Sequence, residues 1–174
     1  MQPIGLFGLS VVFSFVAWGL VSAHVIWPEL RERTFEDAMR PLLILHSFRF
    51  VGLSFLIPGV VSGDLPVNFT FDAAYGDIVA MLLAIAALAA LRTRLGIPLV
   101  WIFNLWGSID LLNAFYQASR GGIMPGHLGA TYFIPTVLVP LALITHGLMF
   151  RLLVRRARPQ VARYATPHPP AVGV

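Results

Sequence analysis

Five long apolar stretches dominate this sequence and limit what it can fold into. They cover approximately residues 4–28, 41–61, 73–91, 97–118 and 131–150. A helix crosses the hydrocarbon core of a bilayer with about 20 apolar residues, so each stretch is long enough to span it. Of the 174 residues, 57% are hydrophobic and only 11% are charged, which is more apolar surface than a soluble domain of this size could bury. The sequence therefore predicts an all-α integral membrane bundle of five transmembrane helices.

The arginines predict the orientation of this bundle. All 12 basic residues are arginine, and ten of them lie in alternate connections or after the fifth stretch, whereas only Arg120 lies on the opposite side. Positive residues flank the cytoplasmic ends of membrane spans. We therefore expect the N-terminus outside and the C-terminus in the cytoplasm, with the bacterial cytoplasmic membrane as the location. This placement also accounts for the basic pI without a nucleic-acid partner.

The chain divides into one membrane domain and a short tail. We expect the domain to cover residues 1–158 and residues 159–174 to form a disordered cytoplasmic tail, because the tail has four prolines and no apolar periodicity. Between the first two stretches, residues 29–40 are charged and predict a short surface helix. Thr34 and Asp37 have the spacing of a helix cap there.

Small residues and one proline predict how the helices pack. Asp77, Ala80, Ala84 and Ala87 recur at helical spacing, so a neighbouring backbone can approach that face closely. We expect this face, and Asp77 with it, to point inward. Pro140 lies inside the fifth stretch and predicts a kink, because proline lacks the amide hydrogen that continues a helix.

Charged side chains within the apolar stretches predict a buried network. Such residues are costly at membrane depth and face the bundle interior by default. Arg49 and Asp110 lie at similar depths, so we expect Arg49 to pair with Asp110 first and Asp77 second, with Asn113 extending the network. Two interpretations are open: an ion pair that fixes helix register, or a ligand or proton site.

A polar face on the fourth stretch predicts a vestibule that opens to the outside. Its members are Trp106, Asp110, Asn113 and Gln117, and Tyr75, Asp77 and Tyr116 lie at comparable depth. Together they would line an acidic, aromatic pocket. The alternative is that the amides bridge helices and the tyrosines belong to the interfacial aromatic belt.

Histidines on three different stretches predict a second site near the cytoplasmic face. His24, His46 and His146 lie at one depth, with Asn104 beside them. Imidazole is the commonest metal ligand and the usual axial ligand of haem iron. We expect His46 and His146 to clamp haem b or a metal ion, with His24 as a third metal ligand, and Asn104 and Thr145 as partners of the second ring nitrogens. The alternative is that histidines are tolerated near the interface without binding anything.

Three functions are compatible with these residues. The first is a binding module that holds haem, a metal ion or a lipophilic ligand in the cytoplasmic half of the bundle. The second is a proton-coupled transporter or relay that uses Arg49, Asp110 and Asp77. The third is an accessory or anchor subunit of a larger membrane complex or a homo-oligomer. The chain has no cysteine and none of the common hydrolase, metalloprotease, P-loop or dinucleotide motifs, so no enzyme class is predicted.

Overall fold

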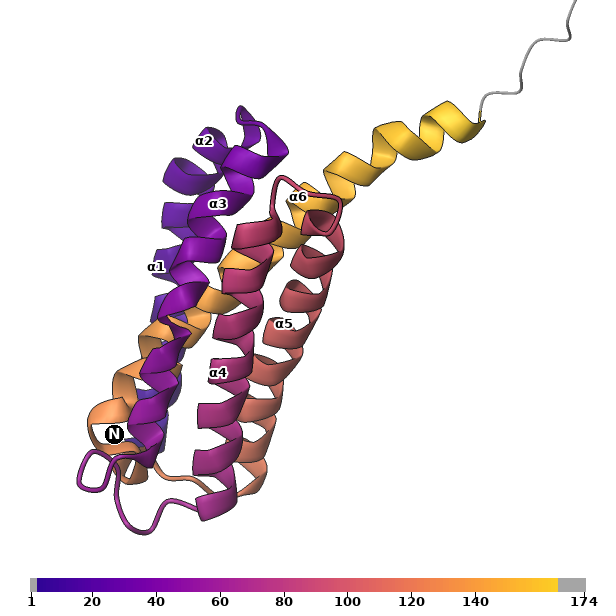
Figure 1. Cartoon of the computed structure of the whole chain (residues 1–174). Helices are drawn as coiled ribbons and strands as arrows, with labels where there is room; N and C mark the ends of the chain where they lie inside the picture. The colour runs from indigo at the N-terminus through magenta and orange to yellow at the C-terminus, as the bar shows by residue number, and fades with distance from the viewer. Residues whose placement is uncertain (1–2, 166–174) are drawn as a thin grey trace, which may run out of the picture.

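The computed structural model describes residues 3–165, and helices make up nearly all of them (Figure 1). The elements are α1 (Pro3–Val21), η1 (Ser22–Ile26), α2 (Trp27–Arg31), α3 (Phe35–His46), η2 (Ser47–Leu56), α4 (Val67–Ala90), α5 (Gly96–Arg120), η3 (Pro125–Tyr132), η4 (Ile134–Leu138) and α6 (Val139–Ala165). Five continuous helical runs are long and apolar enough to cross a membrane. They are Pro3–Arg31, Phe35–Leu56, Val67–Ala90, Gly96–Arg120 and Ile134–Ala157. The all-helical prediction is confirmed at this level.

The second run begins earlier than the sequence indicates. We expected a separate surface helix before residue 41, but α3 starts at Phe35 and passes through Pro41 without a break. Thr34 is its N-cap, and the Thr34 hydroxyl accepts a hydrogen bond from the Asp37 amide at 3.3 Å, as the cap spacing predicts. Pro41 lies inside the helix, where it has no amide hydrogen to donate to the carbonyl of Asp37.

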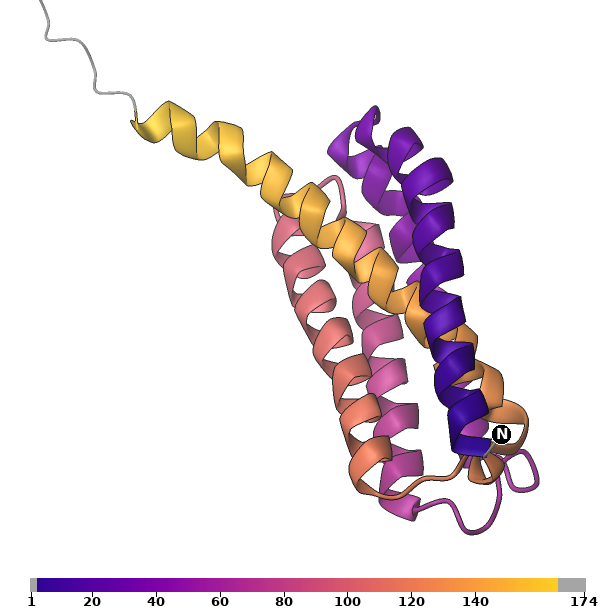
Figure 2. The ribbon, with the colours of Figure 1, turned by 180° about the vertical axis from the view of Figure 1, so that it is seen from behind.

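Four of the long helices form the core of the bundle and α1 lies outside it. The run α3–η2 packs on α4, α4 packs on α5, and α6 packs on both α3 and α5. Helix α1 contacts mainly α6 and η4, and none of its residues is buried (Figure 2). In Figure 1, α2, the α4–α5 connection and the end of α6 lie at one end of the molecule, whereas the N-terminus and the loops before α4 and after α5 lie at the other.

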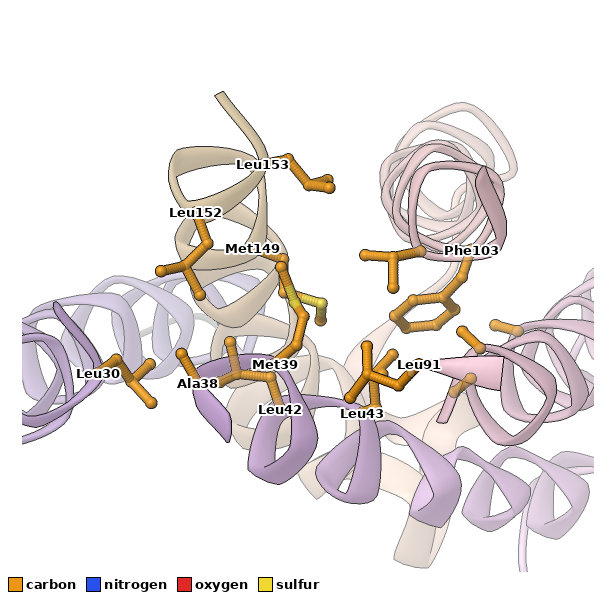
Figure 3. Close-up of a cluster of buried hydrophobic side chains, with 14 residues drawn as sticks. Leu30, Ala38, Met39, Leu42, Leu43, Leu91, Phe103, Met149, Leu152 and Leu153 are labelled. Atoms are coloured by element: carbon orange, nitrogen blue, oxygen red, sulfur yellow. The ribbon is translucent and has the colours of Figure 1, made fainter. Parts of the chain in front are cut away.

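Two clusters of buried apolar side chains fill the bundle, one toward each end. The first lies toward the end with the α4–α5 connection and includes Met39, Leu43, Phe103 and Met149, which converge from three helices (Figure 3). The small-residue face of α4 packs into it, and Ala80, Ala84 and Ala87 have no exposed surface, which confirms that this face points inward. The second cluster, toward the N-terminal end, contains Phe55, Leu65, Phe69, Leu111, Leu128, Ile134 and Val139.

The last helical run has an irregular start and a long end. We expected a kink at Pro140. The irregularity lies instead in the preceding turn, where residues Ile134–Leu138 are π-helical. A π turn re-pairs the backbone that a proline would leave without a partner. At the other end α6 continues to Ala165, so the first seven residues of the expected tail are helical. The remainder of that tail, 166–174, lies outside the described residues.

Candidate functional site

Polar side chains, all buried except the half-buried Asp110, form a layer between the two apolar clusters. On α5, Asn104 and Asp110 lie between Phe103 of the first cluster and Leu111 of the second. The other three core helices follow the same order. They contribute His46 and Arg49 from α3 and η2, Asp77 from α4, and Thr145 and His146 from α6. We call these residues, with Asn104 and Asp110, the polar layer.

The 3₁₀ helix η2 brings Arg49 into this layer. A 3₁₀ helix has three residues per turn, so side chains three apart share one face. Arg49, Gly52 and Phe55 are the buried residues of η2, at that spacing, and they face α4. A 3₁₀ run of ten residues is unusually long. An α-helix would rotate Phe55 away from the face that carries Arg49.

Arg49 lies between the two carboxylates. Its Nε donates to Asp77 Oδ1 at 2.6 Å, and its Nη2 donates to Asp110 Oδ2 at 2.5 Å. Nη1 points to the carbonyl of Gly107 at 3.4 Å. The side chain of Arg49 is 7% exposed, against 11% for Asp77 and 15% for Asp110. The structure therefore brings together both expected partners, with Asp77 held as closely as Asp110.

Three glycines provide the space that these polar side chains occupy. A Cβ atom at Gly52 would overlap the Asp77 carboxylate, and one at Gly76 would overlap the Asp110 carboxylate. At Gly107, a Cβ would lie 2.6 Å from the His146 ring and 3.0 Å from Arg49 Nη1. Each acidic or imidazole side chain thus packs directly on the backbone of a neighbouring helix.

The two buried histidines contact each other next to the charged cluster. His46 and His146 are each 1% exposed, and their ring centroids lie 4.2 Å apart. His46 Nε2 is 3.0 Å from Thr145 Oγ1, and His146 Nδ1 is 2.7 Å from Asn104 Oδ1. The Asn104 amide also donates to the His146 carbonyl at 3.3 Å. Asn104 and Thr145 are therefore the neighbours of these rings that the sequence suggested.

This arrangement does not fit haem held between the two histidines. A porphyrin would have to lie between the rings, which are in direct contact and packed against Phe103 at 5.1 and 5.2 Å. His146 Nε2 is buried without a hydrogen-bond partner, but it abuts Gly107 of α5. Among residues 3–165, no three histidine, aspartate or glutamate side chains are grouped as metal ligands would be.

Two residues that the sequence assigned to these buried sites are exposed. His24 is exposed within η1, so it does not join His46 and His146 as a third ligand. Asn113 is also exposed, and it borders a small crevice beside Asp110 instead of bonding to Arg49. Helical spacing predicted the position of each residue along its helix. It could not predict which side of the helix faces the bundle, because that depends on how the helices pack.

An apolar cavity of about 210 Å³ opens on the acidic side of the polar layer. Its walls come from the second half of α5, the first half of α4, η2, η3, η4 and the starts of α1 and α6. Asp77 and Asp110 are the lining residues nearest the middle of α4 and α5, so they mark its inner end. Four phenylalanines line it: Phe7, Phe55, Phe69 and Phe115. Arg49, His46 and His146 do not line it. The cavity is thus in the half of the bundle opposite to the histidine end.

Comparison with known families matches residues 6–154 to a domain of unknown function, DUF8737. The chain belongs to this family. No curated protein and no solved structure matches it. The DUF8737 region contains the whole polar layer and every wall of the cavity except Ile4.

The phenylalanines of this DUF8737 cavity were not singled out from the sequence. We expected Tyr75, Tyr116 and Trp106 to line an acidic vestibule, but these side chains are 57%, 57% and 46% exposed on the outer surface of the bundle. Gln117 donates instead to Asp72 at 3.1 Å. The three glycines were also missed, since a glycine next to a carboxylate is visible only after the helices are paired.

Proposed function

We propose that this protein spans a membrane and binds a small lipophilic ligand in the cavity that ends on Asp77 and Asp110. The observation that carries the proposal is the combination of an apolar, phenylalanine-lined cavity with two carboxylates at its inner end. Pockets for small molecules typically combine mainly apolar walls with a few fixed polar groups. An apolar cavity of roughly 150 Å³ can hold a benzene-sized molecule, so about 210 Å³ is sufficient for a single-ring compound.

The arginine distribution supports membrane insertion with the C-terminal end in the cytoplasm. Arginines from distant segments meet around one end of the bundle, where Arg151 lies 4.0 Å over the Trp27 ring and Arg156 pairs with Glu36 at 3.0 Å. Arg92 approaches Asp37 at 4.0 Å at the same end. By the positive-inside rule this end faces the cytoplasm, and for a bacterial protein the membrane is the cytoplasmic one. The cavity then lies in the outer half of the membrane.

A charged cluster at this depth favours a binding site over a purely structural ion pair. Buried ion pairs seldom stabilise a fold better than apolar residues of the same volume. A cluster that only fixed helix register would gain nothing from facing a cavity. Asp77 and Asp110 both line it, so a ligand in the cavity lies next to two acidic side chains.

Proton relay is the second candidate, and one observation favours it. Polar groups follow each other from the cavity through the layer: Asp110 contacts Arg49, Arg49 lies beside His146 at Gly107, and His146 contacts His46. A relay of this kind would carry protons toward the cytoplasmic end. Haem or a metal ion at the histidines has less support because the rings are in contact. An anchor role, or pairing with a second copy, would use the largely exposed α1.

The proposal is tested by photolabelling in proteoliposomes with a trifluoromethylphenyl diazirine, a small lipophilic probe. Labelling of α4 and α5 peptides should contain a component that excess benzotrifluoride competes away. Ala73→Phe, which fills the cavity wall, should abolish this component. Ala86 lies on the exposed side of the same helix, so Ala86→Phe should retain the competed component. Labelling that is not saturable in the unmodified protein would contradict the proposal.

A further inference from the structure

The charges at the inner end of the cavity do not balance. Asp77 and Asp110 share one guanidinium, that of Arg49, and no other arginine of the described residues pairs with either of them. With both acids ionised, the three side chains carry one negative charge in excess. An uncompensated charge in an apolar interior is strongly unfavourable, so it is either removed by a proton or balanced by a bound cation.

The position of Arg49 leaves this excess charge facing the cavity. Asp77 and Asp110 line the cavity, whereas Arg49 does not and contacts the backbone of α5 at Gly107. A molecule that enters the cavity therefore meets Asp77 and Asp110 and not Arg49. An anionic head group would be repelled there, and a neutral one would leave the excess charge unpaired.

The aromatic walls of the cavity also favour a cation. Phe7, Phe55, Phe69 and Phe115 surround the apolar space, and Phe55 and Phe69 meet edge to face with centroids 5.8 Å apart. The faces of aromatic rings attract cations, and groups of them recognise quaternary ammonium ligands. Aromatic walls that lead to a carboxylate are therefore the chemistry that binds an organic ammonium ion.

We infer that the ligand of this cavity is a lipophilic ammonium cation, whose charged group approaches Asp110 and Asp77 while its apolar body lies among the phenylalanines. The inference rests on the proposed function, because it assigns a chemical class to the ligand of the same cavity. Binding needs no covalent step. The alternative source of positive charge is a proton held by one of the two acids, and in that case the cavity would not prefer cations.

Two competitors of nearly identical shape separate these cases. Benzyltrimethylammonium and neopentylbenzene differ by one charge and are compared as competitors of the saturable diazirine labelling in proteoliposomes. To remove the effect of partitioning into lipid, the ratio of their competition constants is compared between protein variants. Asp110→Asn should reduce the preference for the cation by about tenfold relative to the unmodified chain. Asp64→Asn removes an exposed loop acid and should leave the ratio unchanged.

A second variant keeps the test valid if Asp110→Asn does not fold. Phe115→Leu removes one aromatic face at small cost in volume, and it should weaken competition by the cation more than competition by neopentylbenzene. The inference is overturned if labelling is saturable but the ratio is the same in the unmodified chain, Asp110→Asn and Phe115→Leu. If labelling is not saturable at all, the proposed function itself fails.

Discussion

At the scale of single residues, Arg49 is the shared cationic partner of two carboxylates in the bundle interior. It contacts Asp77 at 2.6 Å and Asp110 at 2.5 Å, and both acids are mostly buried. Arg49→Ala would strand them, and loss of one partner of a buried ion pair costs about 3–5 kcal/mol. We expect this decrease in the free energy of unfolding in SDS titrations of the detergent-solubilised protein. Arg40→Ala, at an exposed site, should change it little. Equal stability of the two variants would contradict the buried pairing.

Gly76 tests the close packing of the layer. A methyl group at Gly76 would overlap the Asp110 carboxylate, so Gly76→Ala should displace Asp110 and lower stability by about 1–3 kcal/mol, the usual cost of overpacking. Gly147→Ala is the matched control, because nothing lies within 4 Å of that position in α6. In the control, alanine should be neutral or slightly stabilising, since it favours helix by about 0.5–1 kcal/mol over glycine. Both variants are measured by thermal unfolding in detergent, and a stable Gly76→Ala protein would show that Asp110 is not held as described.

At the scale of elements, Thr34 defines where the second helical run begins. Its hydroxyl accepts from the Asp37 amide at 3.3 Å and donates to Asp37 Oδ2 at 2.8 Å. Thr34→Ala removes both bonds, and loss of an N-cap typically costs about 1 kcal/mol. Thr34→Ser keeps the hydroxyl and should retain most of the stability. The comparison is made by SDS titration, and identical losses in the two variants would exclude the cap as the cause.

Sequence patterns predicted the helices and the positions of the polar residues along them well. They predicted less well which residues are neighbours in space. The five long apolar helices and the contact partners of Arg49 follow from the lengths of the apolar stretches and from the cost of placing charges within them. Gly52 and Phe55 could not be placed, because they share a face with Arg49 only in a 3₁₀ helix, and the sequence reads equally well as α-helix. His24 lies on the exposed face of its helix for a related reason. Its depth follows from its position along the chain, but the direction of its side chain depends on which helices pack beside it.

The cavity could not be predicted from the sequence because it depends on several elements at once. Its walls combine residues from α1, η2, α4, α5, η3, η4 and the start of α6 with the connection between α5 and η3. The π turn before Pro140 contributes Ile134 and Pro135, whose positions depend on how the proline is accommodated. Asp77 and Asp110 stood out in the sequence as isolated charges within apolar stretches. The apolar residues that line the cavity could not be distinguished from the other apolar residues of those stretches.

At the scale of the whole molecule, the proposed orientation in a membrane predicts from which side the cavity is reached. The chain has no cysteine, so single cysteines can be introduced without background. In intact cells, a membrane-impermeant maleimide should label Asp64→Cys, in the loop before α4. Arg94→Cys, between α4 and α5, should be labelled only after permeabilisation. The opposite pattern would reverse the orientation, and with it the half of the membrane that holds the cavity.

The binding of a small lipophilic molecule beside Asp77 and Asp110 is tested most directly by locating one there. Bromobenzene suits this purpose, because its single ring fits about 210 Å³ and bromine can be located by anomalous scattering from crystals of the purified protein. We predict a bromine site enclosed by Phe69, Leu111 and Phe115, which is lost in Ala73→Phe. Bromine found only on the lipid-facing surface, with this cavity empty at saturating bromobenzene, would contradict the account.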